Sequence, residues 1–226
     1  MLKKLFIAPY FGELPTWMSS YMSDIEHLHQ YGYDILIDQN LKRFEQRVGD
    51  ILGVQCAPLT GTRKLSDLRL MLGELYKDEI SDTDFWGLTD FDCAYGRVNK
   101  FITEEQLAGL DIHSNHHCYV CGPWTLFRNT EKINSLFREF PGWREEVTRP
   151  TMSGWGEQEY SAIVDREHKA GKLRRLYTHF QSSNPDDMSK ILRQGDALYE
   201  GGTEIMMCHF NRLKVYPHAL QSGGGF

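Results

Sequence analysis

The first forty residues contain an apolar run, an amphipathic segment and a second apolar run, and this order constrains the fold strongly. Residues 2–8 are predicted to form a buried strand, and residues 16–31, which end before Gly32, a helix. Residues 33–38 follow as a second short strand. Strand, helix and strand within so short a stretch predict an α/β fold in which neighbouring strands are parallel.

The remaining chain continues the alternation and is predicted to close with a small β-hairpin. The further predicted elements are helices at residues 41–52, 64–75 and 132–140, a last helix from residue 184, strands at 54–59, 85–89 and 176–181, a loop at 143–156, and a hairpin at 197–210. Residues 1–218 are therefore expected to form a single domain with a mostly parallel central sheet flanked by helices. The glycine-rich residues 219–226 are expected to be a linker or tail, which could lead to further domains.

The apolar run Phe85 to Thr89 ends in two acids, Asp90 and Asp92, separated by one residue. Acids at the carboxyl end of a buried strand stand where open α/β sheets bind ligands. Side chains two residues apart in an extended segment point to the same side, so the two carboxylates can converge. Such hard oxygen donors suit Mn²⁺ or Mg²⁺ bridged to a phosphate. Acids are also common in solvated turns, so the pattern alone leaves both interpretations open.

Residues at the ends of the first two predicted strands are candidates for nucleotide contacts. They are Ala8, Pro9, Tyr10, Phe11 and Asp38, which would meet the base and ribose. Asp38 fits equally well as a helix cap or turn residue.

Lys64 and Asp67 lie about one turn apart near the start of a predicted helix, preceded by Arg63. A helix start flanked by cations can bind a diphosphate, although a solvated helix face has the same composition. Glu157 and Glu159 follow Trp155, where they could bind an acceptor sugar stacked on the ring. They could equally supply negative charge to a helix N-terminus.

A segment dense in histidine and cysteine, residues 113–121, contains a C-x₂-C pair formed by Cys118 and Cys121. Such a pair with nearby histidines can bind zinc, but the second ligand pair of a zinc finger is missing from the sequence. Ordinary core and strand-edge residues are therefore the favoured interpretation. His209, at the end of the predicted hairpin, is on its own more typical of a packed side chain than of a metal ligand.

Composition argues against several classes of protein. The formal net charge of −6 and the isoelectric point near 5.8 argue against a nucleic-acid partner. No apolar run approaches the roughly 18 residues of a membrane span. Five cysteines without the spacing of a disulfide scaffold favour a reducing, cytoplasmic location.

Taken in order, short motifs of this chain resemble those of the GT-A fold glycosyltransferases found in bacterial polysaccharide loci and in large DNA viruses of algae. The likeness is to the amino-terminal domains of viral capsid-glycosylating enzymes, and for a viral protein the location would be the host cytoplasm. The motifs cover about residues 5–215 and are Pro9-Tyr10-Phe11-Gly12, Lys64-Leu65-Ser66-Asp67, Asp84-Phe85-Trp86-Gly87, Asp90-Phe91-Asp92, Tyr95-Gly96, Lys100-Phe101-Ile102-Thr103, Thr125-Leu126-Phe127-Arg128-Asn129 and His209-Phe210. Arg69-Leu70 departs from a Lys-Pro pair common among relatives.

The resemblance implies a role for each candidate. Pro9 to Gly12 and Asp38 would hold the base and ribose, and Lys64 and Asp67 would face the diphosphate and donor sugar. The Mn²⁺ or Mg²⁺ ligands would be Asp92 and His209 with Asp90, which would also touch the ribose or donor sugar. Lys214 would neutralise phosphate charge.

The expected function is that of a hexosyltransferase, which transfers a sugar from a nucleotide-sugar donor to a glycan or glycoprotein acceptor. The expected donor is a UDP-sugar. The resemblance favours retention of configuration; if configuration inverts, Glu157 or Glu159 is the candidate base. Two alternatives stay open. A nucleotidyltransferase would share the metal and acids, although its usual glycine-rich loop after the first strand is absent from the sequence. A binding module would keep the fold without turnover.

Overall fold

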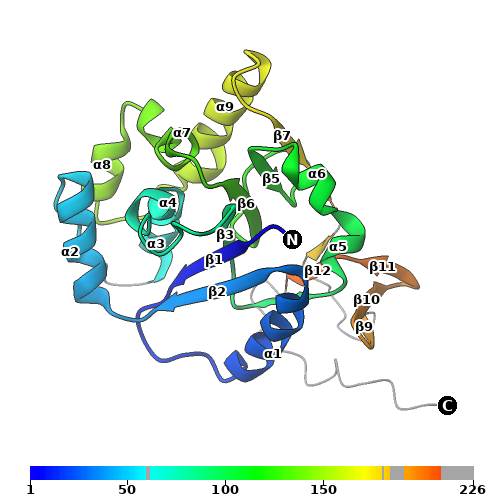
Figure 1. The fold of residues 1–226 in the computed structure, drawn as a ribbon. Helices are drawn as coiled ribbons and strands as arrows, with labels where there is room; N and C mark the ends of the chain where they lie inside the picture. Colours follow the sequence, from blue (N-terminus) through cyan, green and yellow to red (C-terminus); the bar gives the residue numbers. More distant parts are fainter. Residues whose placement is uncertain (60–61, 180, 184–190, 210–226) are drawn as a thin grey trace.

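Figure 1 shows a computed structural model of the chain, which describes residues 1–59, 62–179, 181–183 and 191–209. Its centre is a six-stranded sheet with the order β2-β1-β3-β6-β5-β7. The strands are β1 (Lys4–Pro9), β2 (Tyr33–Asp38), β3 (Phe85–Thr89), β5 (Ile112–Ser114), β6 (Trp124–Arg128) and β7 (Arg175–Tyr177). All but β6 run in one direction, because β6 is antiparallel to both of its neighbours. The predicted α/β class with a mostly parallel sheet is confirmed.

Helices and further small sheets cover both faces of the central sheet (Figure 1). The helices and 3₁₀ turns are α1 (Met18–Leu28), η1 (His29–Tyr31), α2 (Leu41–Leu52), α3 (Thr62–Leu68), η2 (Arg69–Met71), α4 (Leu72–Leu75), α5 (Val98–Phe101), α6 (Glu104–Ala108), α7 (Glu131–Asn134), η3 (Leu136–Glu139), α8 (Trp143–Thr148) and α9 (Trp155–Lys169). One core lies under α2, α3, α4, α7, α8 and α9, and a second lies under α1, α5 and α6.

The alternation of side chains along β3 separates the two cores. Trp86 and Leu88 belong to the first core, while Phe85 belongs to the second. Since successive strand residues point to opposite faces, an unbroken apolar run is what a strand buried on both sides requires. Gly87 lies between Trp86 and Leu88. A Cβ atom at this position would come within 2.9 Å of the Phe6 ring and within 2.8 Å of the Thr125 carbonyl oxygen, so there is no room for a side chain.

Two three-stranded sheets complete the fold. One has the order β11-β10-β9, formed by β9 (Ile191–Gln194), β10 (Ala197–Glu200) and β11 (Thr203–Ile205), and the other has the order β4-β12-β8, formed by β4 (Cys93–Tyr95), β8 (Gln181–Ser183) and β12 (Met207–His209). The predicted hairpin at residues 197–210 is confirmed between β10 and β11. Its second strand is shorter than predicted, because the chain leaves this sheet after Ile205 and β12 pairs with β4 instead.

Two predictions for the first core were wrong. Residues 54–59 are not a strand: the Ala57 amide donates to the Val147 carbonyl of α8 at 3.2 Å, and Pro58 has no amide proton for a sheet. Residues 143–156 are not a loop throughout, because they contain α8 and the start of α9. Trp143 and Val147, one turn apart, bury the inner side of α8.

Other helices differ from prediction in their detail. The helix predicted at residues 64–75 is α3, η2 and α4 in succession, and the one predicted at 132–140 is α7 followed by η3. The predicted last helix from residue 184 begins outside the described residues, as does the predicted tail at 219–226. In the described part of the chain, no helix is both long and apolar enough to cross a bilayer.

Candidate functional site

A cleft of about 670 Å³ opens at the carboxyl ends of β1 and β3. Ala8, Pro9 and Tyr10 line one side of it, and Thr89 to Asp92 line its floor. This is the edge of an open α/β sheet at which ligands bind, because the strands end there and their loops diverge. The sequence-based expectation placed the site at the same edge.

Two segments far apart in the sequence bring Asp92 and His209 together. Asp92 immediately precedes β4, and His209 ends β12 opposite Cys93 in the antiparallel register. His209 Nε2 lies 3.3 Å from Asp92 Oδ1 and 3.8 Å from Asp90 Oδ2. The side chains are only partly exposed, 14% for His209 and 30% for Asp92.

Asp92 and His209 each stabilise the charged form of the other. Burial alone would raise the pKa of the Asp92 carboxyl, but the hydrogen bond and charge of His209 outweigh it and lower that pKa. Burial alone would lower the pKa of the His209 imidazole, but the hydrogen bond to Asp92 and the charges of Asp90 and Asp92 raise it. The acids thus favour positive charge at His209, as they would favour a cation between them.

The donor set fits a hard divalent cation. Adjacent ligands of an octahedral ion at about 2.1 Å stand roughly 3 Å apart, close to the 3.3 Å between Asp92 and His209. Cys93 lies near enough to complete the group. Burial, however, raises the pKa of the Cys93 thiol well above its ordinary value, and a protonated thiol is a poor ligand. Asp92, His209 and Asp90 therefore remain the candidate ligands.

Arg69 is a cleft residue to which the sequence alone assigned no role. Its Nη1 lies 2.5 Å from Asp90 Oδ1, so it neutralises one acid of the D-x-D motif. Gly122 lies against the same guanidinium, and a Cβ atom there would come within 2.7 Å of Nη1. The position of Arg69, two residues after Asp67, did not indicate that it faces the cleft. The 3₁₀ turn η2 changes the helical periodicity at this point.

Aromatic side chains form part of the first wall. Tyr10 packs against Phe91 with ring centroids 5.2 Å apart, and Trp17 Nε1 donates to the Phe91 carbonyl at 3.0 Å. Phe11 and Asp38 do not line the cleft, so their contacts with base and ribose stay a prediction. Phe11 packs on Phe44, and the Asp38 carboxylate accepts from the Tyr76 hydroxyl at 2.7 Å, away from the cleft lining.

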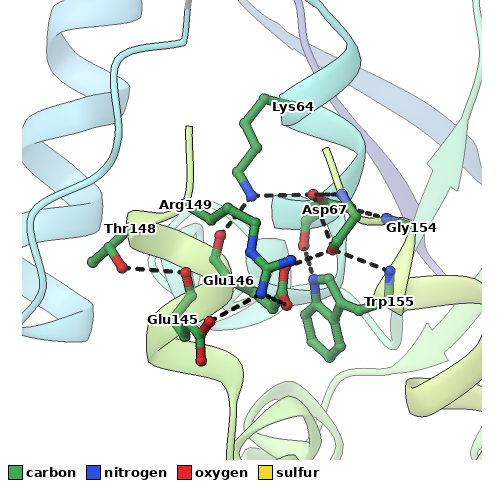
Figure 2. Close-up of polar contacts among 9 residues, drawn as sticks. Lys64, Asp67, Glu145, Glu146, Thr148, Arg149, Gly154 and Trp155 are labelled. Carbon is green, nitrogen blue, oxygen red and sulfur yellow. Dashed lines mark hydrogen bonds and ion pairs between the residues drawn. The ribbon is translucent and has the colours of Figure 1, made fainter. Parts of the chain in front are cut away.

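The predicted diphosphate residues form a buried network of polar contacts (Figure 2). Lys64 is 4% exposed and donates to the Asp67 carboxylate and the Glu146 carbonyl. Asp67 is 1% exposed and also accepts from the amides of Ser153 and Gly154, each at 2.9 Å. Asp67 lines the cleft and Lys64 does not, so a contact of both with a diphosphate stays a prediction.

The two predicted acceptor acids lie differently on α9. Glu157 lines the cleft, whereas Glu159 is exposed and outside the lining. Residues two apart on a helix face different directions, so only one of them can point into the cleft. Lys214 lies outside the described residues.

With this geometry established, the fold proves to be that of the GT-A glycosyltransferases. The structure is similar to the crystal structure of a glycosyltransferase involved in the glycosylation of the major capsid of PBCV-1. The two share 11% identity at a TM-score of 0.54, over 93% of this chain and 94% of that one. The resemblance seen in the sequence is thereby confirmed at the level of the fold.

Two weaker similarities accompany it. One is to the galactosyltransferase LgtC in complex with donor and acceptor sugar analogues, with 13% identity, a TM-score of 0.47, and coverage of 92% of this chain and 87% of that chain. The other is to mouse xyloside xylosyltransferase 1 in its apo form, with 10% identity, a TM-score of 0.45, and coverage of 93% and 98%.

By sequence, residues 6–197 match the model of a family of unknown function (DUF6625), and the chain belongs to this family. No curated protein matches the sequence.

Proposed function

We propose that this chain is a metal-dependent glycosyltransferase that moves a sugar from a nucleotide donor, preferably UDP-linked, to a glycan or glycoprotein acceptor. The observation that carries the proposal is the meeting of Asp92 and His209, 3.3 Å apart, in a cleft at the carboxyl ends of β1 and β3. The GT-A fold supports it, because a solved structure with this fold is that of a glycosyltransferase.

The chemistry follows from the leaving group. Breaking the bond between the anomeric carbon and a nucleoside diphosphate builds negative charge on the departing phosphate oxygen. Mn²⁺ or Mg²⁺ held by Asp92 and His209, with Asp90, would supply Lewis-acid stabilisation of that charge. Arg69, which neutralises Asp90, and Lys214 are the side chains proposed to add positive charge beside the departing phosphate.

The remaining walls supply donor and acceptor contacts in this proposal. Ala8, Pro9 and Tyr10 would hold the nucleotide base and ribose. With retention of configuration, the departing phosphate can take the acceptor proton and no protein base is needed. With inversion, a base is required, and Glu157 is the better candidate because it lines the cleft.

Release of UDP across a panel of UDP-sugars, with and without Mn²⁺, tests this function. The wild type is expected to hydrolyse or transfer at least one sugar in a metal-dependent way. Asp92→Asn is expected to lose about 100-fold or more of that rate, since electrostatic stabilisation of a leaving group contributes at this scale. Asp50→Asn, a change of an exposed acid on α2, is the matched control and should retain the activity.

Two results would contradict the proposal. Silence across the panel, with UDP still bound, would indicate a binding module. Pyrophosphate release from a nucleoside triphosphate and a sugar phosphate would indicate a nucleotidyltransferase.

A further inference from the structure

A second group of metal-ligating side chains lies in the connection between β5 and β6. His116, His117 and Cys118 each offer one ligand atom, and these atoms all lie within 4.8 Å of one another. The two cysteines of the C-x₂-C pair do not both belong to this group. Cys121 is buried and donates from Sγ to the Trp124 carbonyl at 3.2 Å, whereas Cys118 is exposed.

The spacing within this group suits tetrahedral coordination. His116 Nδ1 lies 3.7 Å from Cys118 Sγ. Nitrogen and sulfur ligands of one zinc ion, at about 2.1 and 2.3 Å, would stand roughly 3.6 Å apart at the tetrahedral angle. The rings of His116 and His117 have centroids 4.3 Å apart, so the second imidazole lies beside the first.

A fourth imidazole approaches this group from another element. His179 follows the end of β7, and its ring centroid lies 5.8 Å from that of His117 and 6.4 Å from that of His116. The parallel register of β5 and β7, in which Ser114 faces Tyr177, brings these two segments side by side. Three imidazoles and one thiol from two parts of the chain thus lie near one another, and the ligand atoms of His116, His117 and Cys118 already lie within 4.8 Å of one another.

The segment is held in place before any ligand binds. The Ser114 hydroxyl donates to the Tyr119 carbonyl at 2.9 Å and accepts from the Cys121 amide at 3.0 Å. The Tyr119 ring packs on His116 with centroids 3.6 Å apart.

From this geometry we propose that His116, His117, Cys118 and His179 bind one zinc-class divalent cation at the rim of the cleft. A thiolate and imidazoles select borderline-soft ions such as Zn²⁺ over Mg²⁺ and Mn²⁺, so this site differs in metal from the one at Asp92. His116 and Tyr119 line the cleft, and the ion would fasten that wall to the end of β7.

Cobalt titration of the chelator-stripped protein tests the site directly. The wild type is expected to take up Co²⁺ with a thiolate-to-cobalt charge-transfer absorption, which Zn²⁺ abolishes by displacement. Cys118→Ser should lose this band, and His179→Gln should bind about 10-fold more weakly or worse. Asp92→Asn, which alters the other metal site, is the matched control and should keep the band.

A thermal measurement separates binding from folding. In the Asp92→Asn background, Zn²⁺ is expected to raise the melting temperature, and adding Cys118→Ser should abolish that rise, while both proteins melt alike without metal because Cys118 is exposed. The proposal is overturned if the wild type shows no charge-transfer band, if Cys118→Ser shows the same band, or if Mn²⁺ displaces cobalt as readily as Zn²⁺.

Discussion

The Asp67 carboxylate accepts from Lys64, from the Ser153 amide and from the Gly154 amide, and Trp155 Nε1 donates to its backbone carbonyl at 3.0 Å. These contacts tie the start of α9 to α3, as Figure 2 shows. Met152, Gly154 and Glu157 of this connection line the cleft. Asp67 therefore shapes the wall of the cleft by fixing the backbone of residues 153–155.

Removing the acid is expected to cost more than removing its cation. Asp67→Ala leaves the buried Lys64 ammonium without its carboxylate and two part-buried amides without their acceptor, for an expected loss of about 3–5 kcal/mol in the free energy of unfolding. Lys64→Met leaves Asp67 with both amide donors, so a smaller loss of roughly 1–3 kcal/mol is expected. Urea denaturation of both variants measures the order, and an equal or larger loss for Lys64→Met would contradict this assignment.

Acid sensitivity is expected from His113, a fully buried residue of β5. Burial lowers the pKa of its imidazole from 6.5 to about 4. The unfolded chain binds a proton below pH 6.5 that the folded chain does not take up until about pH 4. The stabilising effect is thus complete above pH 6.5 and lost as the pH falls, by at most about 3 kcal/mol.

The variant His113→Gln isolates this effect, because glutamine does not titrate. Its free energy of unfolding should fall less than that of the wild type between pH 7 and pH 4.5. Parallel curves for the two proteins over that range would show that His113 does not cause the acid sensitivity.

At the scale of elements, α4 packs closely on the central sheet at one glycine. A Cβ atom on Gly73 would lie 2.4 Å from the Trp86 ring, which is itself fixed by donating to Asn134 Oδ1 at 2.7 Å. Gly49, in the middle of α2, has no atom within 4 Å of the same position. A side chain at position 73 would therefore clash with Trp86, whereas one at position 49 would meet open space.

Substituting alanine at these positions should change stability in opposite directions. Gly73→Ala is expected to destabilise the fold by about 1–3 kcal/mol, through displacement of Trp86. Gly49→Ala is expected to stabilise it by roughly 0.5–1 kcal/mol, because alanine favours the helix. Thermal denaturation of both variants measures this, and a neutral Gly73→Ala would show that α4 can move away from the sheet.

Elements with strong local signals were predictable, and those defined by distant contacts were not. Residues 33–38 and 41–52 were predicted to the residue, because Gly32 and Asn40 mark their boundaries. Thr103 is a residue type that commonly caps helices, and it forms a capping box with Gln106. Residues 54–59 resemble a strand in their apolar content, but only their packing against α8 decides their conformation.

At the scale of the whole molecule, the cleft depends on long-range pairing that no short motif contains. Asp92 and His209 meet because β12 leaves the hairpin sheet and pairs with β4. The sequence indicated each residue as a candidate, and the resemblance joined them. The contact of Arg69 with Asp90 could not be predicted, since it depends on the 3₁₀ turn between α3 and α4.

Asp92 and His209, which both line the cleft, are proposed to form a metal-dependent site for a UDP-sugar. The direct test is the change in melting temperature caused by UDP with Mn²⁺, measured for the wild type and for Asp92→Ala. At 100 times the dissociation constant a ligand stabilises by about 2.7 kcal/mol, which for a chain of this size is a rise of roughly 5–10 °C. We expect such a rise for the wild type and little or none for the variant, whereas equal shifts in both would contradict the proposed site.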